Sequence, residues 1–127
     1  MSVGIFDPGA TEGALDIELV EVLLRQFADT LPDRASDEVE RFSVLARHPG
    51  WPGVVEGFAT PELIRLVKIL TLLEREHLAF SAGADSPVIT MVRALKSRGD
   101  WDRTLSQWVK SNTDNKFLPH GNLMERL

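Results

Sequence analysis

The chain has 127 residues, enough for one domain that buries roughly two thirds of its unfolded surface. It has no cysteine, which excludes disulfides, thiol catalysis and cysteine-ligated metal clusters. The net charge is −5, and the charged residues are distributed unevenly along the sequence. Residues 1–62 hold four basic and twelve acidic side chains, whereas residues 88–127 hold seven basic and four acidic ones. This separation of acidic and basic residues favours self-association, or a basic face that binds an anionic partner.

The N-terminal segment, residues 1–13, is rich in glycine and proline and carries no basic or apolar targeting region. We predict that it is a flexible arm and that residues 14–127 form a single domain. The longest apolar stretch, residues 63–73, is interrupted by two basic side chains and is far shorter than the ~20 residues of a membrane span. We therefore expect a cytoplasmic protein that does not contact a membrane.

Two helices are predicted in the first half of the domain. The first runs from about residue 14 to 30, because apolar residues recur every four positions, and Pro32 ends it. The second begins after Ser36, which is a suitable N-cap, and ends before Pro49. Residues 48–59 hold two prolines and three glycines, which predicts a loop packed onto the body through its apolar members.

The third predicted helix, residues 60–78, carries apolar residues around most of its circumference. Thr60 is the expected N-cap and Pro61 the first helical residue. A helix that is apolar on nearly all sides is typical of the buried centre of a bundle. We therefore place helix 60–78 at the centre of the fold.

Two further helices follow, residues 87–98 after Ser86-Pro87 and before Gly99, and residues 102–111. No segment alternates with a period of two for long, so no sheet is expected. The prediction is an all-α protein, an irregular or orthogonal bundle of about five helices.

Glu74 and His77 form one Glu-x-x-His motif, whose two side chains share a helix face and can both ligate iron. Carboxylate-bridged di-iron bundles use two such motifs and two more glutamates, and this chain has one motif. The alternative is a solvated helix end with His77 near the last carbonyl groups. We expect no metal and no cofactor, and keep Glu74 and His77 as the metal candidates.

Arg41 and His48 lie seven residues apart, two helical turns, and this spacing resembles the arginine–histidine motif of HEPN-type ribonucleases, which are helical bundles. The resemblance implies that His48 carries the proton and that Arg41 holds the scissile phosphate. The match covers eight residues. It departs from the family pattern at Phe42, where a polar residue is usual, and Pro49 places His48 beyond the helix end.

The C-terminal third offers a basic face for nucleic acid, with Trp101 and Trp108 interspersed. The i,i+7 spacing of the two tryptophans is also typical of a core. The tail, residues 116–127, contains five apolar residues, so we predict that it packs onto the body, or else that Phe117 and Leu118 bind a partner. The candidate binding residues are Arg93, Lys96, Arg103, Lys110, Phe117 and Leu118.

No glycine-rich phosphate loop, Gly-x-Ser-x-Gly or His-Glu-x-x-His motif occurs in the sequence. The favoured interpretation is a non-enzymatic protein–protein interaction module that forms a homodimer or binds another protein. The alternative is a helical protein that acts on nucleic acid, either as a binder through its basic face or as a ribonuclease of a toxin–antitoxin pair.

Overall fold

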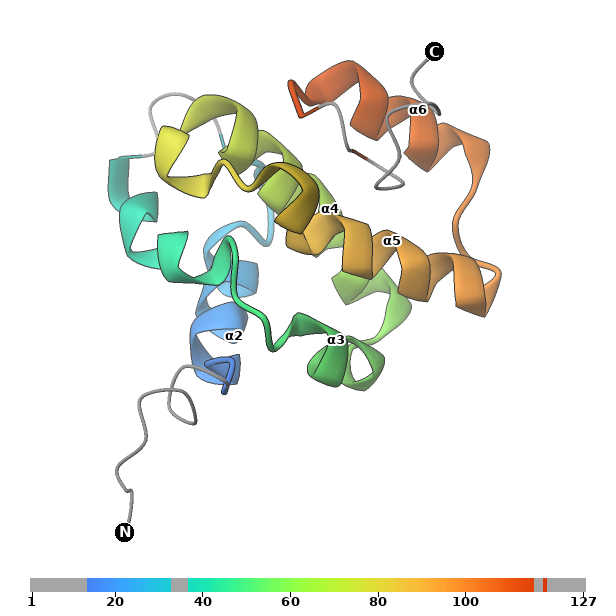
Figure 1. The fold of residues 1–127 in the computed structure, drawn as a ribbon, viewed down its shortest axis with the longest axis horizontal. Helices are drawn as coiled ribbons and strands as arrows, with labels where there is room; N and C mark the ends of the chain where they lie inside the picture. Colours follow the sequence, from blue (N-terminus) through green and yellow to red (C-terminus); the bar gives the residue numbers. More distant parts are fainter. Residues whose placement is uncertain (1–13, 33–36, 116–117, 119–127) are drawn as a thin grey trace, which may run out of the picture.

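The computed structural model describes residues 14–32, 37–115 and 118, and this part of the chain is all-α (Figure 1). It contains five α-helices joined by short 3-10 segments, and no strand among the described residues. The prediction of an all-α bundle is confirmed. The predicted N-terminal arm, residues 1–13, lies outside the described residues.

Helix α2 (Ile17–Gln26) is shorter at both ends than the predicted helix 14–30. It begins at Ile17 because the Asp16 carboxylate accepts a hydrogen bond from the Leu19 amide at 3.1 Å, which makes Asp16 the N-cap. It ends before Pro32 is reached. The carbonyl of Phe27, the C-cap residue, accepts a hydrogen bond from Arg65 Nη1 at 2.5 Å, so tertiary contact holds this end.

The second element, η1 (Asp37–Leu45), is a 3-10 helix where an α-helix was predicted. Its buried residues Val39, Phe42 and Leu45 lie three apart, which matches the three residues per turn of a 3-10 helix. The 3-10 winding therefore keeps all three on one line toward the core. The predicted helix type was therefore wrong.

The predicted loop 48–59 is partly helical, with α3 (Trp51–Val54) followed by η2 (Val55–Gly57). Prolines and glycines suggested a loop, but Pro52 sits in the first turn, where a missing N–H costs nothing. The Trp51 side chain is buried, and its indole N–H donates to the Leu45 carbonyl at 2.9 Å. The predicted packing of this segment onto the body is confirmed.

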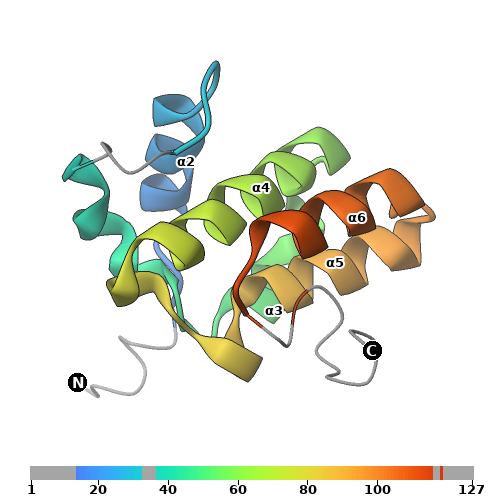
Figure 2. The ribbon, with the colours of Figure 1, turned by 90° about the horizontal axis from the view of Figure 1, so that it is seen from above.

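Helix α4 (Thr60–Glu76) contacts α2, α5 and α6, so its predicted central position is confirmed (Figure 2). Its N-cap is Ala59, where Thr60 was predicted. The Ala59 amide donates to Glu62 Oε1 at 2.8 Å, and the Thr60 hydroxyl donates to Asp100 at 2.8 Å. The threonine hydroxyl thus joins the start of α4 to the segment after α5.

The chain then passes through η3 (Leu78–Phe80) and η4 (Gly83–Asp85) into α5 (Pro87–Arg98) and α6 (Arg103–Asn112). Helix α5 matches its predicted range, and α6 lies one residue later than the predicted helix 102–111. Ser86 caps α5 at its start, Gly99 ends it with φ +77°, and Asp102 caps α6.

One cluster of buried apolar residues takes members from all five α-helices and from η1, η2 and η3, and Leu118 belongs to it. The acidic α2 and the basic α6 lie at opposite ends of the molecule (Figures 1 and 2). No helix in the described ranges is long and apolar enough to cross a membrane.

Candidate binding groove

Two adjoining cavities open on either side of a short shared stretch, Arg47-His48-Pro49. Together we call them the His48 groove. The first, of about 680 Å³, lies between α2, the end of η1 and the segment after η3. The second, of about 300 Å³, lies between the shared stretch and the first turns of α5. Segments far apart in the sequence therefore line two neighbouring cavities that share these three residues.

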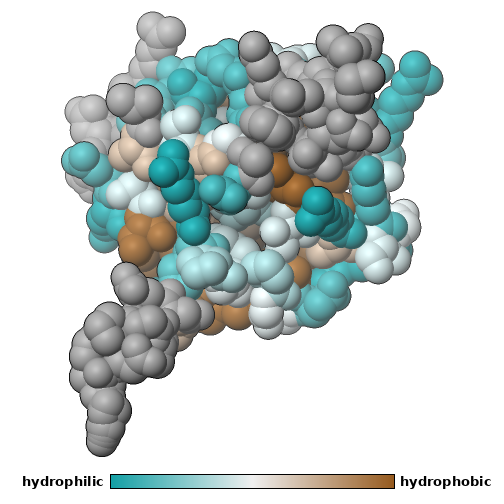
Figure 3. Space-filling view, in the orientation of Figure 1, coloured by the Kyte–Doolittle hydropathy of each residue, from teal (hydrophilic) through white to brown (hydrophobic). Residues whose placement is uncertain are grey.

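The larger cavity is mainly aliphatic. Besides the shared stretch, its lining includes Leu19, Val44 and Ala79. Val44 is the most exposed large apolar side chain in the described part of the chain, at 61%. Figure 3 shows apolar surface where η1 lies, with polar side chains beside it. An exposed apolar side chain at a cavity rim is typical of a contact surface.

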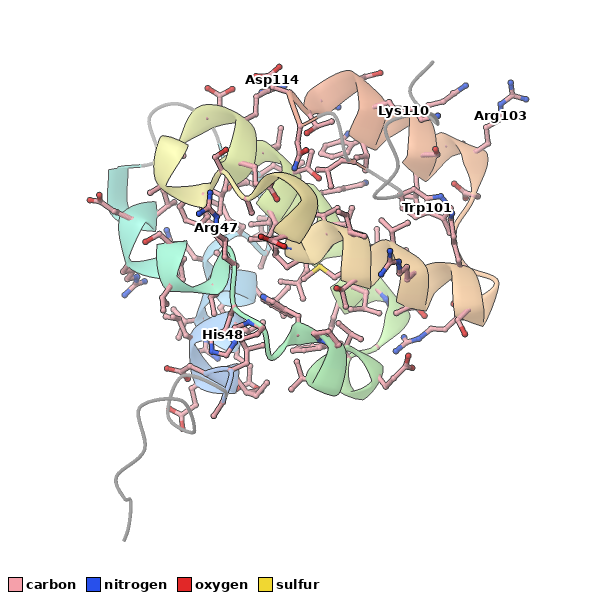
Figure 4. The ribbon with its side chains drawn as sticks, viewed as in Figure 1. Arg47, His48, Trp101, Arg103, Lys110 and Asp114 are labelled. Carbon is pink, nitrogen blue, oxygen red and sulfur yellow. The ribbon has the colours of Figure 1, made fainter. Side chains whose placement is uncertain are left out.

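Arg47 is held in place between the two cavities. Its Nε and Nη2 atoms donate to the Ser81 carbonyl at 3.1 and 2.7 Å. Figure 4 shows Arg47 and His48 on the connection between η1 and α3. Because these bonds use two of its five N–H donors, the guanidinium is oriented while other donors stay available.

His48 is also oriented by the backbone. Its Nδ1 accepts a hydrogen bond from the Gly50 amide at 2.9 Å. A ring nitrogen that accepts carries no proton, so the neutral imidazole has its proton on Nε2. The half-buried ring therefore presents an N–H donor at the other end.

Arg93 is the second arginine that lines the smaller cavity. It is exposed, lines the cavity, and has no hydrogen-bond or ion-pair partner among the described residues. Asp85 is the one carboxylate in that lining. The smaller cavity thus holds two arginines and an imidazole donor against one acid, in a chain with a net charge of −5.

Arg41, the arginine of the predicted catalytic pair, lies elsewhere. It donates to Gln26 Oε1 at 3.0 Å, and its guanidinium lies 4.7 Å from the centre of the Phe42 ring. It lines neither cavity of the groove. The arginines that share a cavity with His48 are Arg47 and Arg93.

Glu74, one of the two metal candidates, is the centre of a polar cluster beneath the start of α5. It accepts hydrogen bonds from the Ser86 hydroxyl and, at 3.1 Å, from Asn115 Nδ2. Asn115 Nδ2 also donates to the Gly83 carbonyl at 2.8 Å, so both of its amide protons are used. Burial raises the pKa of the Glu74 carboxyl to about 7, although the two hydrogen bonds act to lower it.

His77 does not join Glu74 in a ligand set. Its ring packs edge-on against Phe80, with the ring centres 6.2 Å apart, and its Nε2 is buried without a hydrogen bond. Among the described residues, no three histidine or acidic side chains are grouped so that they could hold a metal ion. The hydrogen-bonded cluster around Glu74 connects α4, η4 and the segment after α6.

The candidate basic residues Arg93, Lys96, Arg103 and Lys110 are all exposed. Arg103 and Lys110 project outward from α6 (Figure 4). Trp101 and Trp108 are only half-buried and pack against the core, and Lys68 lies 5.6 Å from the centre of the Trp108 ring. Of the two tail residues, Leu118 is buried and Phe117 lies outside the described residues.

Sequence reasoning missed Arg47 and the partners of Glu74. The position of Arg47 directly before His48-Pro49-Gly50 is only a weak signal of a binding site, because a basic residue there also fits an ordinary helix end. Ser86 and Asn115 lie 12 and 41 residues from Glu74, and no local pattern announces either contact.

The chain matches no protein-family model, no curated protein and no solved structure.

Proposed function

We propose that this protein is a non-enzymatic interaction module that self-associates through the His48 groove. The occupant of the groove is the acidic α2 surface of a second copy. Ile17 on α2 is exposed, and Glu18 and Glu21 on the same helix are exposed carboxylates. This combination of one apolar and two acidic side chains suits a groove with an aliphatic cavity beside a cationic one.

The observation that carries the proposal is that Arg93, a cation with no partner among the described residues, lines a cavity next to the one that exposed Val44 lines. Such a surface gains both apolar burial and charge pairing from one occupant. The acidic α2 itself borders the larger cavity through Leu19. A two-fold arrangement can therefore place each α2 against the groove of the other copy, since a two-fold interface uses the same patch twice.

Light scattering at low and high salt tests the proposal. We expect a dimer at low salt and a shift toward monomer at 1 M salt, where the screening length falls to ~3 Å. Arg93→Glu should weaken the dimer, and so should Glu18→Arg combined with Glu21→Arg. The three changes together should restore it, because the charges are then opposite again.

Lys96→Glu is the matched control, since Lys96 is exposed on the same helix as Arg93 but does not line the groove. It should leave the dimer intact. A monomer at every concentration and salt, or an equal effect of Lys96→Glu and Arg93→Glu, contradicts the proposal.

Nucleic-acid binding is the second candidate, supported by the exposure of the four cations on α5 and α6. The half-buried positions of Trp101 and Trp108 speak against a stacking platform for bases. A gel shift with single-stranded RNA at low salt tests it, and Arg103→Gln with Lys110→Gln should weaken any complex and reduce its salt dependence. Loss of RNA upon incubation, abolished by His48→Ala, would instead indicate a nuclease.

A further inference from the structure

We infer that the smaller cavity of the His48 groove binds a phosphate group, held by Arg47, Arg93 and the Nε2–H of His48. The inference concerns the cavity of a single copy and does not rest on self-association; phosphate and the acidic α2 of a second copy would compete for Arg93.

The three donors come from two segments that the fold brings to one cavity, residues 47–48 and the second turn of α5. Two of them are already oriented: Arg47 by the Ser81 carbonyl and His48 by the Gly50 amide. Preorientation lowers the conformational cost of binding, since these side chains are fixed before the ligand arrives. Arg93 supplies a guanidinium with no partner among the described residues.

The backbone contributes little to this site. The first amides of α5 are already used, since the Val88 amide donates to the Ser86 hydroxyl and the Ile89 amide to the Ser86 carbonyl. Asp85 lines the same cavity, and its negative charge repels an anion. The site therefore depends on its side chains, and removal of the Asp85 charge should strengthen it.

A phosphate group fits the three donors better than a carboxylate does. It offers more acceptor oxygens and a larger charge, and arginine binds it through two parallel hydrogen bonds. The cavity of about 300 Å³ leaves room for a small organic group beyond the phosphate. Its lining holds two aromatic rings. Trp51 is 1% exposed and donates its indole N–H to Leu45, and the His48 ring is assigned to the phosphate, so no further ring is left to stack on a nucleobase.

The test is a two-dimensional NMR titration of the labelled protein with inorganic phosphate, glycerol 3-phosphate, adenosine monophosphate and acetate at matched ionic strength. We expect saturable shifts of the Gly50 amide and the Arg93 side chain with all three phosphates. Adenosine monophosphate should bind no tighter than glycerol 3-phosphate, because the base finds no stacking partner. Acetate should bind about tenfold more weakly, as expected for the loss of one charge-assisted hydrogen bond.

Three variants at exposed positions test which side chains bind the phosphate. Arg93→Gln should weaken phosphate binding about tenfold, Asp85→Asn should strengthen it, and Lys96→Gln should leave it unchanged. Unsaturable shifts, equal effects of Arg93→Gln and Lys96→Gln, or acetate binding as tight as phosphate binding would each overturn the inference. Phosphate binding by a strictly monomeric chain would support this site and reject the proposed self-association, so the two proposals fail separately.

Discussion

At the scale of single residues, Glu74 is the group whose surroundings change its chemistry most. Desolvation raises its pKa from an ordinary value of 4.5 to about 7. The folded state therefore holds this proton more tightly than the unfolded chain between those two pH values. By linkage, Glu74 stabilises the fold most below pH 4.5, and this contribution is lost as the pH rises through 7.

Glu74→Gln tests this directly. Glutamine can keep its carbonyl oxygen toward Asn115 and its amide toward the Ser86 hydroxyl, so the cluster stays bonded. The wild-type free energy of unfolding should fall by up to ~3 kcal/mol between pH 4.5 and 8 relative to the variant. Urea unfolding of both proteins across this range measures the difference. Parallel pH profiles would show that Glu74 titrates normally.

At the scale of elements, the end of α5 depends on the backbone freedom of one glycine. Gly99 has φ +77°, and a Cβ added there would meet no atom within 4 Å. Gly99→Ala should therefore cost only the left-handed strain of ~1 kcal/mol, which lowers the melting temperature by about 4 °C.

Gly53 in α3 is the matched comparison. A Cβ there also meets nothing within 4 Å, and its φ lies outside the left-handed range. Gly53→Ala should raise stability by ~0.4–1 kcal/mol, since the unfolded chain loses freedom. Calorimetry of the two variants should give shifts of opposite sign, and a shared sign would contradict the backbone argument.

The segment after α6 should contribute to stability through Leu118. This side chain is 1% exposed and joins the common core. Leu118→Ala should cost about 2–5 kcal/mol, and truncation after Asn115 should destabilise the fold as well. Val44→Ala, at a position that is 61% exposed, should change stability by less than ~0.5 kcal/mol. Thermal unfolding followed by circular dichroism compares them, and equal melting temperatures would show that Leu118 is dispensable.

At the scale of the whole molecule, α4 contacts α2, α5 and α6, and one core includes residues from all five α-helices. We predict that residues 14–127 unfold in a single transition. The unfolding curve from tryptophan fluorescence, which reports on Trp51 in α3, Trp101 before α6 and Trp108 in α6, should coincide with the curve from circular dichroism. Leu66→Ala at the centre of α4 should shift both curves equally, whereas separated curves would indicate two independent units.

The sequence by itself determined the elements whose signals are local. The near-continuous apolar surface of helix 60–78 identified the centre of the bundle, and Ser86 and Gly99 marked the two ends of α5. These signals lie within one or two turns of the helix they describe, so they are present in the sequence whatever the rest of the chain does.

Only the tertiary structure decided the winding of η1, the helical turn α3 and the early end of α2 at Phe27, because packing against distant residues overrides local propensity there. The same holds for the His48 groove. Its lining comes from residues 14–19, 43–52, 79–81 and 85–93. The prediction from the sequence paired His48 with Arg41 because their spacing fits a regular helix. A cavity is defined by how separate segments pack, so the arginines beside His48, Arg47 and Arg93, became identifiable only once those segments were placed.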